Sequence, residues 1–216
     1  MGVSWRRWLP AALAHAAGAA PLALLLRDHW QGLLIIDPVG IITARAGQAA
    51  LIMLLLSLTM TPVQTLTGWR FWARLRRPLG LYAFLYAGLH FLTFVGLDYR
   101  FNLAWILEAI FLQRYVIVGF AAGLILLLLA ATSSPLGERR IGRQWKALHR
   151  LAYLAGALAV AHYLWLGKDI RQPLRYAAAL ILLLVLRLPP LREALERARR
   201  RIGPLLFDRG VEGAGR

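Results

Sequence analysis

Long apolar runs, separated by short polar and basic stretches, dominate the sequence. Six of these runs are close to the ~20 apolar residues that a helix needs to cross the ~30 Å hydrocarbon core of a bilayer. They cover residues 9–26, 49–66, 79–97, 115–131, 148–166 and 173–188. The pattern therefore predicts an all-α membrane protein, in which residues 1–216 form one transmembrane domain built as a bundle of six helices.

Two further segments have helical patterns without the length of a span. Residues 98–114 carry apolar side chains at helical spacing, which predicts a short amphipathic helix on the outer surface. Residues 191–216 form a basic tail, whose first part alternates Arg and Glu and is expected to lie in solvent or among lipid headgroups. The Gly-rich end, residues 208–216, is expected to be disordered.

The first apolar run has a second interpretation. Arg6-Arg7 precede it and Ala14-His15-Ala16 resembles a small-residue cleavage site, as in a secretory signal peptide. The run continues past that site to Leu26, so we expect a retained helix.

The charges set the orientation of the predicted bundle. The chain holds 26 Lys and Arg against 10 Asp and Glu, although 59% of it is hydrophobic. With the N-terminus inside, 19 of the basic residues fall on the cytoplasmic side and 7 on the outer side, which satisfies the positive-inside rule. Both termini are therefore predicted to be cytoplasmic. A nucleic-acid binder is disfavoured, because no long stretch has the composition of a soluble module that could display the charge.

The chain has no cysteine, which excludes a cysteine-ligated iron–sulfur cluster and a C-x-x-C-H haem attachment. It has no P-loop, no H-E-x-x-H and no nucleophile–base arrangement, so no catalytic residue is predicted. A metal centre would have to use histidines or carboxylates, or belong to an organic cofactor.

Five histidines are the candidate ligands: His15, His29, His90, His149 and His162. An imidazole at bilayer depth is costly unless it is bonded, so each buried one suggests a function. His29 lies just outside the first span and is expected to be wetted. His15 is expected to hydrogen-bond a neighbouring helix.

His90 and His162 form the best ligand pair. His90 lies roughly three helical turns into the third span and His162 roughly four turns into the fifth, and these spans run in the same direction. The two imidazoles therefore lie at similar depth, as axial ligands on either side of a haem iron would. The alternative is that the imidazoles only join helices by hydrogen bonds.

His149 is harder to interpret, because the roughly 13 residues between it and His162 rotate a helix by about 220°. An undistorted fifth span would therefore not place the two rings on one face. The helix is distorted near Gly156, or the two histidines address different cofactors, or His149 is not a ligand. The third span offers no second histidine as a partner, so a second haem iron at His149 would need an unusual ligand.

The sequence resembles the MsrQ (YedZ) family. The resemblance rests on two motifs, Arg76-Arg77-Pro78-Leu79-Gly80-Leu81 leading to His90, and residues 141–153 leading to His162-Tyr163-Leu164-Trp165. Asp37-Pro38-Val39-Gly40 and Thr61-Pro62 extend it over nearly the whole chain.

The resemblance implies a ferric-reductase-like bundle in the bacterial inner membrane that binds haem b and flavin mononucleotide (FMN). It implies haem ligation by His90, His149 and His162, with the haem count of one or two left open. It further implies a periplasmic molybdopterin-containing methionine sulfoxide reductase subunit as partner, and a cytoplasmic flavin reductase or quinone as electron donor. Four arginines could hold the flavin phosphate: Arg74, Arg76, Arg77 and Arg143.

Two other functions stay open at this point. One is a self-standing transmembrane ferric or quinone reductase. The other is a non-enzymatic, transporter-like protein whose histidines join helices or relay protons.

Overall fold

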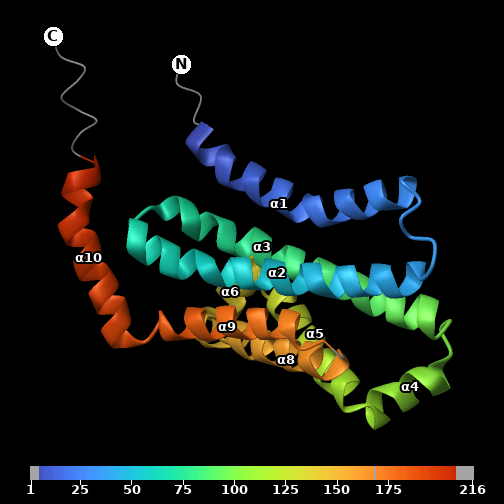
Figure 1. Ribbon diagram of the computed structural model, residues 1–216. Coiled ribbons are helices and arrows are strands. Elements are labelled where there is room, and N and C mark those ends of the chain that lie inside the picture. Colours follow the sequence, from blue (N-terminus) through green and yellow to red (C-terminus); the bar gives the residue numbers. More distant parts are fainter. Residues whose placement is uncertain (1–4, 168, 208–216) are drawn as a thin grey trace.

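The computed structural model describes residues 5–167 and 169–207, with side chains from residue 8 to residue 200 apart from residue 168. Regular structure in these residues is helical, as the apolar pattern predicts, and Figure 1 shows most of the long helices lying side by side. Their bounds are α1 (Trp5–Trp30), α2 (Pro38–Thr67), α3 (Arg70–Thr93), the π-helix η1 (Phe94–Asp98), α4 (Leu103–Leu112), α5 (Arg114–Ala131), α6 (Pro135–Ile141), the 3₁₀ turn η2 (Gly142–Gln144), α7 (Trp145–Leu148), α8 (Leu151–Leu166), α9 (Arg171–Val185) and α10 (Pro189–Phe207).

Four described helices are long and apolar enough to cross a membrane: Trp8–Trp30, Pro38–Thr67, Arg70–Asp98 and Arg114–Ala131. A fifth crossing is counted if α9 and α10, which meet at a 76° bend, form one broken span. The outer faces of α1, α5 and α9 expose leucines, for example Leu182, which is 57% exposed. A soluble monomer rarely exposes apolar surface on this scale, so the chain is a multi-pass membrane protein.

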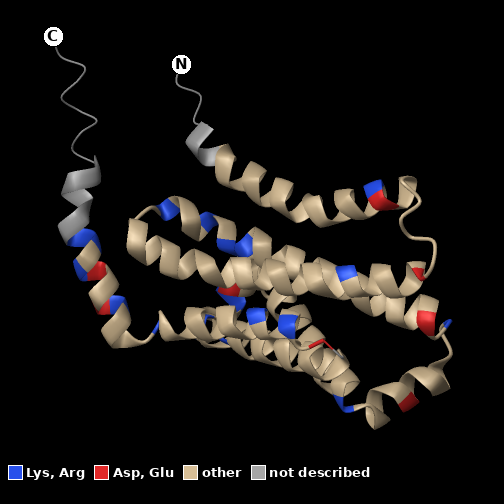
Figure 2. Ribbon diagram, viewed as in Figure 1, with Lys and Arg blue, Asp and Glu red and all other residues tan. Residues whose placement is uncertain are grey.

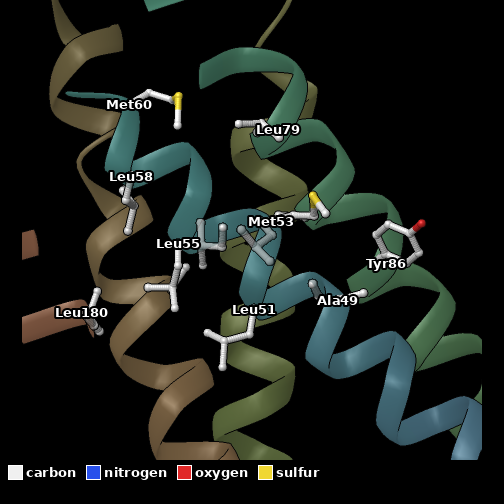
Figure 3. Packing of buried hydrophobic residues seen from close by; sticks show 14 of the residues in the cluster. Ala49, Leu51, Met53, Leu55, Leu58, Met60, Leu79, Tyr86 and Leu180 are labelled. Atoms are coloured by element: carbon white, nitrogen blue, oxygen red, sulfur yellow. The ribbon is translucent and has the colours of Figure 1, made fainter. Parts of the chain in front are cut away.

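Helix α2 lies at the centre of the fold. It is apolar all round, and its successive residues Met53, Leu54 and Leu55 are all buried. Figure 3 shows Met53 and Leu55 of α2 in the cluster of buried side chains that also holds Leu79 from α3 and Leu180 from α9. The helix begins well before the predicted span 49–66, because Asp37 caps it by accepting a hydrogen bond from the Gly40 amide and Pro38 fits its first turn.

Helix α1 is joined to α3 by tyrosines. Pro21 leaves a gap in the backbone hydrogen bonds of α1. Next to this gap, the Tyr86 hydroxyl lies between two backbone groups of α1. It donates a hydrogen bond to the Gly18 carbonyl and accepts one from the Leu22 amide at 3.3 Å. His15 Nδ1 lies 3.0 Å from the Tyr82 hydroxyl, which confirms that this histidine bonds a neighbouring helix.

Helix α8 is shorter than the span predicted over 148–166. It starts at Leu151, after a turn at His149 and Arg150 that separates it from α7. His149 and His162 therefore do not share one helix, and their spacing along the chain does not set their relative direction. The break in helical structure lies at His149 and Arg150, and α8 continues through Gly156 without interruption. Gly156 is buried where an added Cβ would lie 3.3 Å from Leu180 Cδ1, so it serves close packing of α8 against α9.

The bundle has two different ends. We call one the α4 end: there α1 and α3 finish, α2 and α5 begin, and α4 lies across the edge. We call the other the α10 end: it holds the α2–α3 turn, the α6–α7 segment and the bend into α10. Figure 2 shows Lys and Arg concentrated near the α10 end, on the start of α3 and on α10.

The two short predicted segments form helices of different character. Residues 191–201 lie within α10, as the Arg and Glu pattern indicates, while 208–216 are outside the described residues. The segment over 98–114 contains α4, which buries Ile106 and Ala109 and leaves Leu103, Phe111 and others exposed.

Candidate haem site

Two imidazoles face each other between α3 and α8 at the α4 end. The ring centroids of His90 and His162 are 6.0 Å apart and the ring planes are nearly perpendicular, at 82°. His90 sits in the last full turn of α3, and His162 lies about one turn before the end of α8. The structure thus brings together the two histidines that were predicted to lie at similar depth in the third and fifth spans.

Each ring is held by a backbone carbonyl. His90 Nδ1 lies 2.8 Å from the Thr43 oxygen of α2, and His162 Nδ1 lies 2.7 Å from the Tyr115 oxygen of α5. A carbonyl only accepts, so each Nδ1 carries a proton, and in the neutral ring this leaves the lone pair on Nε2. Such outer hydrogen bonds fix the tautomer of metal-binding histidines and raise their basicity.

A glycine explains why these carbonyls are accessible inside a helix. In an α-helix the carbonyl of residue i meets the amide of residue i+4, and the side chain at i+4 stands beside it. Gly47 follows Thr43 by one such step, and Gly119 follows Tyr115 by the same step. An added Cβ would lie 2.9 Å from His90 Nδ1 at Gly47 and 2.6 Å from His162 Nδ1 at Gly119. The two glycines make room for the two rings.

The two half-sites repeat the same spacing. Each carbonyl residue precedes its histidine by 47 positions, and each glycine precedes its histidine by an equal interval as well. Neither glycine and neither carbonyl residue was selected as a site residue from the sequence. The sequence signal that could have revealed them is a repeated spacing. Thr43, Gly47 and His90 are separated by the same numbers of residues as Tyr115, Gly119 and His162.

The residues fit a haem better than a bare metal ion. Two imidazoles at this separation could bind one metal ion between them, because two metal–nitrogen bonds of about 2 Å, with roughly 1 Å from each nitrogen to its ring centre, together span about 6 Å. The observed separation is 6.0 Å. Among the described residues no group of three or more His, Asp or Glu comes together to hold an ion. A porphyrin supplies the remaining ligands itself.

His149 has a different environment. It lies at the α10 end, where its Nε2 is 3.2 Å from the Thr132 hydroxyl. The ring of Trp145 stacks on it with a centroid distance of 3.9 Å, and the Trp145 indole donates to the Thr132 carbonyl. These contacts tie the α6–α8 segment to the end of α5, and the structure does not bring His149 to another histidine.

Three of the four arginines assigned to a flavin phosphate, Arg74, Arg76 and Arg77, lie at the start of α3, and Arg143 lies in η2. Arg76 lines a cavity of about 610 Å³ at the α10 end, and the other three are not among its lining residues. We call this the arginine cavity, because its wall carries five guanidinium groups: Arg76, Arg150, Arg187, Arg192 and Arg199. Four of these were not selected as site residues from the sequence, where they were counted only as topology-setting charge.

The fold and the site together define a class of protein: a multi-pass membrane protein whose apolar helices hold two facing imidazoles between them. The family described as ferric reductase like transmembrane component matches residues 46–160. The match begins within α2, includes His90 and ends within α8, just before His162.

Curated relatives narrow the class. The chain is 46% identical over 179 residues to "Protein-methionine-sulfoxide reductase heme-binding subunit MsrQ" of Xanthomonas euvesicatoria pv. vesicatoria, which covers 80% of this chain and 82% of the relative. A protein of the same name from Xanthomonas campestris pv. campestris (strain 8004) is 47% identical over 177 residues, which covers 79% of this chain and 81% of the relative. One from Rhodospirillum rubrum is 42% identical over 177 residues, which covers 78% of this chain and 85% of the relative. The chain belongs to the MsrQ family of ferric-reductase-like membrane proteins.

Proposed function

We propose that the protein is a haem-b electron-transfer subunit that carries electrons across a bacterial inner membrane to a methionine sulfoxide reductase. The observation that carries this proposal is the His90–His162 pair, with both Nδ1 protons committed to carbonyls. The name of the relatives, which describes heme-binding subunits of a protein-methionine-sulfoxide reductase, supports the same function.

In this proposal His90 and His162 hold the haem through Nε2. Bound haem supplies a one-electron centre, and the protein sets its position and its potential. The carbonyls of Thr43 and Tyr115 keep the rings in the ligating tautomer, while the glycines beside them allow the rings to approach. His149 is a candidate ligand of a second haem iron, once the ring is released from Thr132.

The proposed topology has six crossings and two cytoplasmic termini. Helix α8 has 16 residues and α9 has 15 residues. They rise about 24 Å and about 22 Å, slightly short of the hydrocarbon thickness. We propose that both still cross, because α8 packs along α5 and carries His162 at the depth of His90. The α10 end then faces the cytoplasm, in agreement with the positive-inside rule.

The α4 end faces the periplasm in this arrangement, and the histidine pair lies near it. The proposed electron acceptor is a periplasmic molybdopterin-containing subunit, and the proposed donor is a cytoplasmic flavin reductase or the quinone pool. FMN is proposed as a further cofactor on the cytoplasmic side, with Arg76 as the arginine best placed for its phosphate. Each methionine sulfoxide takes up two electrons and two protons to give the thioether and water, so the subunit must deliver two electrons per turnover.

The proposal is tested by reoxidation of the reduced protein. Purified protein is reduced anaerobically and mixed with the periplasmic reductase, with or without methionine sulfoxide. We expect the haem absorption to return to the oxidised spectrum only when the reductase and the sulfoxide are both present. Equally fast reoxidation by ferric citrate or a quinone without the reductase would support a self-standing reductase instead.

A further inference from the structure

The arginine cavity concentrates positive charge that the described residues do not neutralise. Its wall carries five guanidinium groups and one carboxylate, Glu196, which is paired with Arg192 at 3.1 Å. Among the side chains that the structure describes, no carboxylate lies within ion-pair distance of the other four arginines. Guanidinium groups are protonated near neutral pH, so the cavity carries this positive charge under physiological conditions.

Helix dipoles do not offset this charge. The cavity lies at the C-terminal end of α2, which contributes only about half a negative charge. The hydrogen-bond partners of the cavity's inner arginines are neutral. Arg76 donates to the Gln64 side chain at 3.3 Å, and Arg187 donates to the Leu58 carbonyl.

Arg187 is a half-buried arginine of the cavity and is held in place by its neighbours. It lies in the bend between α9 and α10, half-buried, with its guanidinium carbon 4.6 Å from the centre of the Tyr153 ring. Its Nε atom is buried and makes no hydrogen bond with the described residues. A buried N–H donor without an acceptor is rare and costly, so a missing acceptor is indicated here.

Helix α10 closes the cavity from the other side. Arg192 and Arg199 lie about two turns apart on its face toward α2. Arg199 packs on Gly68, where an added Cβ would lie 3.3 Å from Nη1. Gly68 adopts a left-handed conformation, with φ of 76°, that ends α2 and opens this space. The cavity, with a volume of about 610 Å³, is of the size that holds a small ligand or a lipid headgroup.

We propose that the arginine cavity binds a phosphate group, either the headgroup of an anionic phospholipid or a soluble phosphate ester, and that the bound phosphate fastens α10 to α2 and α3. Guanidinium forks match phosphate oxygens, and several forks around one cavity give a specific site. Both sources fit the position of the cavity at a basic end of the bundle, where headgroups and cytosolic solutes meet. The proposal does not depend on the haem. A soluble ester bound here could be the FMN that the proposed function places at Arg76, so this source rests on the proposed function, whereas the lipid source does not.

The test uses the full chain in neutral detergent and measures thermal unfolding by intrinsic tryptophan fluorescence. Ligands are phosphatidylglycerol, with phosphatidylcholine as its uncharged reference, and inorganic phosphate against chloride at equal ionic strength. The binding variant is Arg192→Gln/Arg199→Gln. The matched control is Arg197→Gln/Arg200→Gln, which removes the same charge from the same helix outside the arginine cavity.

We expect a ligand-dependent rise in unfolding temperature in the wild type and in the control, and an apparent affinity at least tenfold weaker in the binding variant. Protection by phosphatidylglycerol alone identifies a lipid headgroup, whereas protection by inorganic phosphate identifies a soluble ester. Equal responses of the two double variants, or no response of the wild type to either ligand, would overturn the proposal. Size-exclusion profiles establish that both variants are folded.

Discussion

Glycines beside the histidines offer a sharp test of the site, because a single methyl group displaces a ring without removing a ligand. At Gly119 an added Cβ would lie 2.6 Å from His162 Nδ1. An ordinary contact needs about 3.5 Å, so the ring must move by roughly 0.9 Å. The hydrogen bond from Nδ1 to the Tyr115 carbonyl is 2.7 Å long in the structure. A shift of this size lengthens it to a distance at which it is lost.

The size of the effect follows from the role of that bond. Loss of an outer partner of a metal-binding histidine costs about 10–100-fold in metal affinity, equivalent to about 1.4–2.7 kcal/mol. For Gly119→Ala we therefore expect haem affinity to fall within that range. At Gly47 the added Cβ would lie 2.9 Å from His90 Nδ1. The required shift is only about 0.6 Å, so Gly47→Ala should weaken binding less.

The chain provides matched controls in the same bundle. Gly123, one turn beyond Gly119 in α5, and Gly88 in α3 have nothing within 4 Å of an added Cβ. Alanine there should raise helix stability by up to about 1 kcal/mol and leave haem binding unchanged. The assay is haem retained per chain during competition with apomyoglobin, measured by pyridine haemochrome. If Gly119→Ala bound haem as tightly as Gly123→Ala, the role assigned to the Tyr115 carbonyl in holding His162 would be refuted.

Three further predictions concern packing. Asp28→Asn should lower the unfolding temperature in detergent, because buried Asp28 holds α1 to α2 through Arg45; an unchanged temperature would show that the pair contributes nothing. Ser57 donates to the Arg76 carbonyl at 2.7 Å across α2 and α3. Ser57→Ala should therefore cost about 0.6–1 kcal/mol in unfolding free energy, and an unchanged value in denaturant titration would contradict this. Trp145→Ala should speed tryptic cleavage between residues 139 and 150, because it removes the ring that packs on the α6–α8 segment; unchanged cleavage would argue against that role.

Composition and spacing predicted much of this fold. Apolar runs marked the positions of α1, α2, α3, α5, α8 and α9, because in a membrane each crossing must satisfy its own backbone as a helix. The boundaries were less accurate for physical reasons. Helix α2 starts at Pro38 because Asp37 caps it. Helix α8 starts only at Leu151, after a turn that the sequence does not mark, since residues 145–150 contain no proline or glycine.

The candidate site was only partly predictable. Counting residues along two helices selected His90 and His162, since depth follows directly from helical rise. Their carbonyl partners depend on how α2 faces α3 and α5 faces α8, which sequence spacing does not specify. Only the repeated carbonyl–glycine spacing, one helical turn in each case, links those partners to the sequence.

The central claim is that His90 and His162 hold one haem between them. The most direct measurement is haem per chain, by pyridine haemochrome, with the optical spectrum of the wild type, His90→Ala and His162→Ala. We predict a bis-imidazole spectrum in the wild type and the loss of one haem per chain in each variant. Wild-type haem content and an unchanged spectrum in both variants would contradict the claim.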